Sequence, residues 1–386
     1  MSPFESSSFQ NEWPVLLECA SPQPDAQRLS ALLPGANGPP LLELAAEHGV
    51  LGHLAARLRE MDGDSLPQET KQALLDGRRA QNFVSLRMTA ELFRILDQLA
   101  STGIEALVVK GPVLSVRAYG DPAVRSYGDL DLLVRQRDIR LATELMVAAG
   151  YIAAVPLAAI DAGKIPGQYL FSKPDSKLLI ELHNDFTLRY FPRRLPLETW
   201  FERQAYVRLD SREVPALSVE DELVLICVHG AKHLWERLMW IADVAALVSR
   251  QAKLDWGRTA SSAKEVGAER MLHTGLSLAA DLLRLRLPGD VLASVRLDRV
   301  AAHLTGQILN WLPAAGYAPP GLIERAAFRL RMHGGLVSAP AYFIRLMLSP
   351  TEEDWGAGAE KTQRGFLEVL RRPFRLARKY GRGGKT

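Results

Sequence analysis

The heptapeptide Gly128-Asp129-Leu130-Asp131-Leu132-Leu133-Val134 decides the fold of this chain. Its apolar residues predict a buried strand, and because strand side chains alternate between two faces, Asp129 and Asp131 share one face. Two carboxylates about 6 Å apart repel each other by roughly 3 kcal/mol at an effective dielectric near 20. The pair therefore indicates a bound cation, or one acid that stays protonated. Carboxylate oxygens suit Mg²⁺, which fills its shell with phosphate and water, so the pattern predicts metal-assisted phosphoryl or nucleotidyl chemistry.

Strand and helix patterns alternate around this heptapeptide. Residues 104–109 predict a short strand that closes at Lys110-Gly111-Pro112, and a helix follows over 112–119 because proline favours the first helical position. The later patterns predict a helix over 138–149, a strand over 151–155, and a hairpin of strands 169–172 and 177–183 turned near 173–176. Together they predict a mixed sheet in an α/β core over residues 102–215.

Helical periodicity dominates on both sides of this core, which makes the predicted class α+β. Residues 1–40 read as a loose arm with one short helix, and helices follow over 41–58, with a break near Gly49, and over 68–101. The second of these helices is expected to bury Leu74, Phe83, Leu86, Leu92, Leu96 and Leu99. Further helices are expected over 219–232, 236–250, 258–265, 268–285, 290–313 and 322–348. The predicted segments are 1–101, the core, a helical domain over 216–363 and a basic tail over 364–386.

Composition narrows the class of protein. The 386 residues carry a net charge of only +3, so no general argument for nucleic-acid binding follows. Cys19 and Cys227 are the two cysteines, which fits a reduced, cytoplasmic protein. No apolar run approaches the roughly 18 residues that span a bilayer, and the N-terminus does not resemble a signal peptide. The basic tail reads as a solvated extension, with binding of RNA or a membrane surface as the alternative.

Two further pieces of the predicted core are expected to join the acid pair. The turn at Lys110-Gly111 would let the backbone approach a ligand closely, present a helix N-terminus to an anion, and add a positive charge for a triphosphate. Glu181 lies on a later apolar strand and shares its face with His183, while Asp185 competes for the same role. Three carboxylates on adjacent strands would hold one or two divalent ions, and the third acid would orient or deprotonate an attacking hydroxyl.

Arg125 precedes the acid pair by only a few residues. It is placed either to reach a phosphate or to pair with Asp121. Asp243, which stands among apolar residues, is expected to be a structural hydrogen-bonding acid.

The order of these motifs resembles a known family. A turn glycine, an Asp-hydrophobic-Asp strand and a distant single acid form the pattern of the DNA polymerase β-like nucleotidyltransferase superfamily. More narrowly, the run resembles the bacterial family of uncharacterised nucleotidyltransferases over residues 40–280. The motifs that carry the resemblance are Leu107-Val108-Val109-Lys110-Gly111-Pro112, Tyr119-Gly120-Asp121-Pro122, Arg125-Ser126-Tyr127-Gly128-Asp129-Leu130-Asp131, Ile180-Glu181-Leu182-His183, His229-Gly230-Ala231-Lys232-His233 and Leu238-Met239-Trp240-Ile241-Ala242-Asp243.

The resemblance implies a nucleotidyltransferase fold, a divalent ion (Mg²⁺ or Mn²⁺) and an NTP donor such as ATP. It implies catalytic and metal-binding roles for Asp129, Asp131 and Glu181. The residues that match the nucleotide- and phosphate-binding positions are Lys110, Gly111, Arg125, Ser126, Gly128 and His183. The acceptor is left open among a small molecule, a peptide, a protein and RNA, and so is the oligomeric state.

Two features leave alternatives open. Pro112 follows the turn glycine and lacks the N–H that would face a phosphate, which favours a catalytically silent nucleotide- or partner-binding module as the second hypothesis. His229 and His233 have the spacing of zinc ligands on a helix, but the glutamate of the HExxH motif is missing. A polar helix face beside the site, with Lys232 near phosphate, is the favoured interpretation of that pair.

Overall fold

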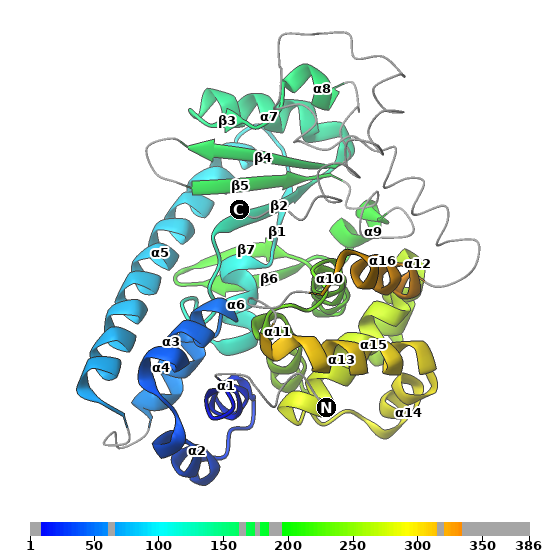
Figure 1. The fold of residues 1–386 in the computed structure, drawn as a ribbon. Helices are drawn as coiled ribbons and strands as arrows, with labels where there is room; N and C mark the ends of the chain where they lie inside the picture. Colours follow the sequence, from blue (N-terminus) through cyan, green and yellow to red (C-terminus); the bar gives the residue numbers. More distant parts are fainter. Residues whose placement is uncertain are drawn as a thin grey trace.

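The computed structural model describes residues 9–60, 66–161, 167–173, 178–184, 195–314 and 320–333. Within these residues, seven strands form one mixed sheet. Their order is β3-β4-β5-β2-β1-β7-β6, and the helices pack around the sheet (Figure 1). This confirms the predicted α+β class. The strands are β1 (Ala106–Val109), β2 (Asp129–Val134), β3 (Ile152–Ala153), β4 (Gln168–Lys173), β5 (Leu178–His183), β6 (Ala205–Leu209) and β7 (Arg212–Ala216).

The strand β2 lies at the centre of the sheet and carries the acid pair. It pairs antiparallel with β1 and parallel with β5, although β1 and β5 are far apart in the sequence. The hairpin β6–β7 extends the sheet beyond β1. The sequence patterns do not reveal it because each strand has only five residues and Pro215 interrupts the second. The strand β3 is shorter than the predicted 151–155.

The two faces of the sheet belong to different apolar cores. Leu130, Leu132 and Ile180 pack in a cluster with α5 (Gln68–Ala100) and α7 (Ile139–Ala148). Leu107 and Leu133, on the opposite face, join a larger cluster made mostly by the other helices. The acids of β2 share the second face because side chains alternate along a strand. The remaining elements before α9 are α1 (Glu12–Ala20), α2 (Ala26–Leu32), η2 (Leu33–Gly35), α3 (Gly38–Glu47), α4 (Leu51–Arg59), α6 (Gly111–Tyr119), η3 (Gln136–Asp138) and α8 (Leu157–Asp161).

The long helix α5 confirms the predicted helix but corrects its buried stripe. Leu74 is buried with the first helices, whereas Leu92, Leu96 and Leu99 are buried against the sheet. Phe83 and Leu86 were expected inside, yet 61% and 71% of their surfaces are exposed. They fall between the two contact regions of the 33-residue helix, so one continuous stripe does not describe it.

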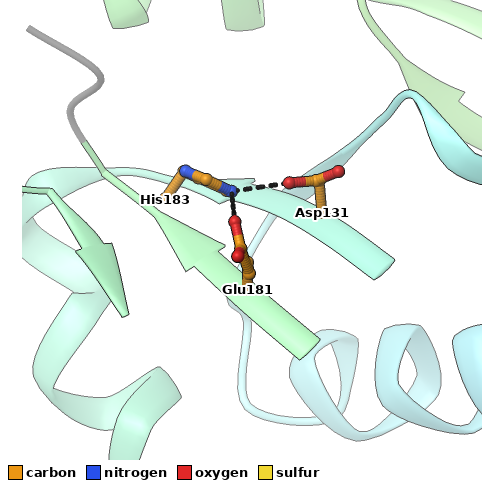
Figure 2. Close-up of side chains that lie close together, drawn as sticks. All are labelled: Asp131, Glu181 and His183. Atoms are coloured by element: carbon orange, nitrogen blue, oxygen red, sulfur yellow. Dashed lines mark hydrogen bonds and ion pairs between the residues drawn. The ribbon is translucent and has the colours of Figure 1, made fainter. Parts of the chain in front are cut away.

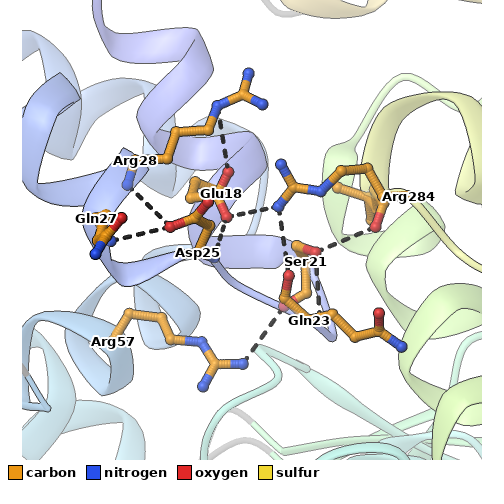
Figure 3. A network of polar contacts seen from close by, with 9 residues as sticks. Glu18, Ser21, Gln23, Asp25, Gln27, Arg28, Arg57 and Arg284 are labelled. Atoms are coloured by element: carbon orange, nitrogen blue, oxygen red, sulfur yellow. Dashed lines mark hydrogen bonds and ion pairs between the residues drawn. The ribbon is translucent and has the colours of Figure 1, made fainter.

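The N-terminal segment is not the predicted loose arm. Helices α1 and α2 are both formed, and Val15 and Leu16 of α1 are completely buried. Figure 3 shows how polar contacts fix the segment to the end of α13 (Glu269–Leu283): Arg284 Nη2 lies 2.6 Å from the buried Glu18 carboxylate, and Ser21 Oγ donates to the Leu283 carbonyl at 3.1 Å. The sequence pattern does not predict both helices, because they are short and lie among turn-forming residues. Their apolar sides become evident only against α13.

The C-terminal half is helical, as predicted. Its elements are α9 (Leu197–Glu202), α10 (Val219–Lys232), α11 (Leu238–Arg250), α12 (Trp256–Val266), α13, α14 (Gly289–Leu297), α15 (Arg299–Trp311), η4 (Leu312–Ala314) and α16 (Leu322–Met332). The predicted helix over 290–313 is in fact two helices, because Asp298 ends α14 and its carboxylate accepts a hydrogen bond from Ala301 N at 3.0 Å to begin α15.

Some predictions fall outside the described residues. These are residues 174–176 of the predicted hairpin turn, the competing acid Asp185, the end of the last predicted helix and the basic tail. Both cysteines are buried and free. Among the described helices, none has the length and apolar character required to cross a bilayer.

A pair of helical glycines tests how tightly α10 packs. A Cβ atom at Gly230 would stand 2.5 Å from the ring of the fully buried Trp235, whereas one at Gly306 of α15 would meet nothing within 4 Å. We expect Gly230→Ala to lower the free energy of unfolding by about 1–3 kcal/mol through overpacking. Gly306→Ala, the matched control, should raise it by up to about 1 kcal/mol.

Urea unfolding of both variants measures these changes. A Gly230→Ala protein as stable as the wild type would show that the ring of Trp235 is free to move, contrary to the packing described.

Candidate active site

The parallel pairing of β2 with β5 places two of the predicted acids side by side. Asp131 stands opposite Glu181, and Leu133 stands opposite His183. His183 Nε2 lies 2.8 Å from Asp131 Oδ1 and 3.3 Å from Glu181 Oε2, and so bridges the two carboxylates (Figure 2). Since both partners are acceptors, Nε2 carries a proton in this arrangement. The contact of His183 with a nucleotide stays a prediction; its position shows that it holds the two acids together.

Lys110 completes the environment of Asp131 from the neighbouring strand β1. Its Nζ atom lies 2.9 Å from Asp131 Oδ2, and its side chain is only 12% exposed. The backbone of Lys110 has φ of 58°, and Gly111 follows with φ of 50°. A positive φ costs a residue with a side chain about 1–3 kcal/mol and is characteristic of functional sites. The strained turn between β1 and α6 thus directs a lysine at the acid.

The charges of this group are strongly coupled. Although burial opposes ionisation, the Lys110 ammonium and the hydrogen bond from His183 hold the pKa of Asp131 below its usual range. Burial, together with the negative charge of Asp131, raises the pKa of Asp129. Burial opposes the charge of His183 too, but its hydrogen bonds to Asp131 and Glu181 raise the pKa of the imidazole. Asp131 is therefore the firmly ionised member of the pair, and Asp129 is the acid that protonates more readily.

The other predicted phosphate-binding residues lie at the start of α6 and in the segment that leads into β2. Gly111 is buried at the start of α6, and Pro112 follows as its second residue. Ser126 is half-buried in the segment before β2. Gly128 is exposed, and a Cβ atom there would meet nothing within 4 Å. Glu181 also accepts a hydrogen bond at 2.6 Å from Gln168 on β4, a contact that no sequence motif predicts.

The sequence offered Asp121 as one of two alternative partners for Arg125, but these two side chains do not pair. The Nε atom of Arg125 donates to Asp243 Oδ2 at 2.8 Å, while Asp121 pairs with Arg78. The side chain of Arg125 is buried in this ion pair, and its predicted contact with a phosphate stays a prediction. Asp243 also accepts a hydrogen bond from Tyr119 at 2.9 Å, which confirms its predicted structural role.

The donor atoms fit a divalent ion. Asp131, Glu181 and His183 each offer a ligand atom, and these atoms lie within 4.8 Å of one another; this group does not include Asp129. Each Asp131 oxygen keeps a second lone pair beyond the contact that it accepts, whereas Glu181 accepts from His183 and Gln168 at Oε2 and would offer Oε1 to a ligand. Two carboxylates suit Mg²⁺ or Mn²⁺. A direct bond from His183 Nε2 would require the loss of the proton that it donates to the carboxylates, and it would favour Mn²⁺ over Mg²⁺.

The pair His229 and His233 on α10 does not form a metal group with any third described ligand. Their ring centroids are 4.7 Å apart, and Trp240 of α11 packs against both. The zinc interpretation therefore gains no support among the described residues.

A mixed sheet with carboxylates on adjacent parallel strands, beside a strained glycine turn, defines a nucleotidyltransferase-like fold. A sequence profile of the family of uncharacterised nucleotidyltransferases matches residues 34–284, more than half of the chain. The chain belongs to this family, which supports a general nucleotidyl-transfer function. No curated protein matches the chain significantly.

The buried His53 of α4, which packs against Tyr119, is expected to make the stability of the fold depend on pH. Its ring meets the Tyr119 ring edge-on at 4.7 Å, neither ring nitrogen has a hydrogen-bond partner in the described part of the chain, and burial lowers its pKa to about 3. Below pH 6.5 the unfolded chain takes up a proton at His53 that the folded protein does not, so stability falls as the pH falls. We expect His53→Phe to remove about 1.5 kcal/mol of the stability loss between pH 6.5 and pH 5.

Urea midpoints at the two pH values measure this difference. The exposed His303 offers a control, since His303→Phe should leave the pH dependence unchanged. Identical pH profiles for the wild type and His53→Phe would mean that His53 is protonated in the folded protein.

Proposed function

We propose that this protein is a divalent-metal-dependent nucleotidyltransferase that transfers an NMP from an NTP to an acceptor nucleophile and releases pyrophosphate. The observation that carries the proposal is the pairing of Asp131 with Glu181 on parallel strands, bridged by His183 and faced by Lys110. Family membership supports the reaction class. The two buried, free thiols suit a reducing compartment, and we propose the cytoplasm as the site of action.

Asp131 and Asp129, with Glu181 across the strand pair, would hold Mg²⁺ or Mn²⁺. A bound divalent ion neutralises charge on the phosphates and favours attack at the α-phosphorus. Because the pKa of Asp129 is raised by burial and by Asp131, the first carboxylate available to a cation is that of Asp131.

Lys110 would bind the triphosphate without leaving Asp131. An ammonium group has three donors, and only one of them serves Asp131 Oδ2. The start of α6 presents the positive end of the helix to the same anion, although Pro112 contributes no N–H there. Gly128 has open space beside the acid strand, since a Cβ atom there would meet nothing within 4 Å.

Glu181 is the candidate general base for the acceptor hydroxyl. Its side chain is 20% exposed, against 2% for Asp131, so it is the more accessible of the two paired acids. His183 and Gln168 both contact Oε2 and would fix the carboxylate in one orientation. A positioned base of this kind supplies about 10²- to 10⁴-fold in rate.

A catalytically silent nucleotide-binding module is the second candidate. Pro112 in the phosphate turn favours it, and so does the involvement of both Asp131 oxygens in contacts within the protein. Calorimetry with each of the four NTPs and Mg²⁺, followed by a pyrophosphate-release assay, separates the candidates, because the silent module binds without turnover. Incubation with α-labelled NTPs and a cell extract would then reveal the acceptor.

Neutralising the acid pair tests the proposed metal site. We expect Asp129→Asn combined with Asp131→Asn to lower NMP transfer more than about 100-fold, because transition-state charge loses several kcal/mol of stabilisation. The control with the same charge change, Asp76→Asn with Asp290→Asn, alters two exposed acids and should keep full activity. Circular dichroism would check the fold, and an unchanged rate in the acid-pair variant would falsify the catalytic assignment.

Glu181→Gln tests the general base separately. Turnover should fall by about 10²- to 10⁴-fold while NTP affinity changes little, since the amide keeps the shape of the carboxylate but not its basicity. Glu213→Gln changes an exposed strand glutamate on β7 and serves as the matched control. Single-turnover kinetics measure the step, and a loss confined to NTP affinity would assign Glu181 to binding instead.

A further inference from the structure

Three flat side chains gather where α10 ends and α11 begins. His229 stands on the last turn of α10 and His233 is the residue that caps this helix, and the Trp240 ring lies 5.5 Å and 5.0 Å from theirs. All three residues are half-buried, whereas Trp235 close by is fully buried. The three residues therefore keep some accessible surface, although Trp240 also packs against the large apolar core.

The backbone between the two helices is strained in a way that maintains this cluster. Leu234 and Trp235 both adopt a positive φ, 55° and 54°, although each has a large side chain. Trp235 N donates to the Gly230 carbonyl at 2.8 Å, which locks the turn against α10. Bulky residues in this region cost about 1–3 kcal/mol each and persist where the surrounding structure enforces them. The turn brings Trp240 back beside His233.

The cluster carries no charge of its own but lies among cations. Burial, with the positive charges of Lys232 and Lys110 nearby, lowers the pKa of His233 to about 3, and burial lowers that of His229 as well. Both imidazoles are consequently neutral at pH 7. Lys110 is the lysine that pairs with Asp131, so the cluster lies within electrostatic range of the candidate active site. The positive charges of Arg237 and Arg329 also lower the pKa of His233.

We propose that the rings of His229, His233 and Trp240 form the stacking surface for the nucleobase of the nucleotide whose phosphates lie at Lys110. This rests on the proposed function. Neutral, partly accessible rings match the flat face of a base, and the surrounding cations match the attached phosphates. Base stacking on aromatic side chains tolerates any base, so the surface contributes affinity without fixing which NTP is used.

Calorimetry with two kinds of probe tests the assignment. The α,β-methylene analogues of ATP, GTP, CTP and UTP carry a base, while inorganic tripolyphosphate does not; each is titrated with Mg²⁺ into the full chain. Trp240→Leu should weaken the tightest nucleotide analogue by at least about 5-fold, which corresponds to about 1 kcal/mol, and leave tripolyphosphate affinity unchanged. Trp240→Phe should retain nucleotide affinity because it keeps an aromatic ring. Trp256→Leu, in a half-buried tryptophan on α12, should change neither affinity.

A second variant protects the test against misfolding. If Trp240→Leu does not fold, His229→Leu with His233→Leu removes the other two rings and is expected to show the same selective loss. Nucleotide affinities that stay unchanged in these variants would overturn the stacking surface alone. An equal loss for nucleotide and tripolyphosphate would overturn it too, because the cluster would then serve the phosphates. A wild-type protein that binds none of the four analogues would overturn the proposed function together with this inference.

Discussion

The ionised carboxylate of Asp131 lies almost entirely out of water, and the surrounding structure must supply partners for it. A buried charge without partners costs several kcal/mol, and Lys110 and His183, one to each carboxylate oxygen, offset the cost of burying this charge. Lys110 reaches the acid only because its backbone accepts a strained conformation. His183 reaches it only because β5 pairs with β2 in parallel and in register. The contacts of Asp131 therefore depend directly on the order and register of the strands.

Buried ion pairs also connect the sheet region to the helices beside it. Arg125 in the segment before β2 binds Asp243 of α11, and Arg117 of α6 binds the buried Glu222 of α10. If either member of such a pair moves away or is removed, the other charge is left buried without a partner, which is strongly destabilising. They fix α6, α10 and α11 relative to the strands, and through them the strained turn that holds Trp240. The candidate base-stacking surface and the acidic group are thus held in one rigid arrangement.

The two faces of the sheet have different tasks. One is covered by α5 and α7 and contributes only packing, whereas the other carries the acids and faces the larger helical core (Figure 1). That core runs from Val15 and Leu16 in α1 to Phe328 in α16, so the N-terminal helices are part of the structure that supports the site. Proteins of this class need a rigid platform for charged groups, because small displacements weaken both metal and phosphate contacts.

The sequence by itself determined the α+β class, most helices and the strands β1, β2, β4 and β5, because these depend on local periodicity, glycine and proline. It also identified Asp129, Asp131, Glu181, Lys110 and His183 as candidates, since paired acids on an apolar strand are rare without a function. Tertiary structure alone decided the partners: His183 bridges two acids, Arg125 turns to Asp243, and β6–β7 joins the sheet. It also decided that Phe83 and Leu86 are exposed and that the first forty residues contain packed helices. These outcomes depend on contacts between residues distant in the chain, and periodicity records only which side of a segment is apolar, not what will cover it.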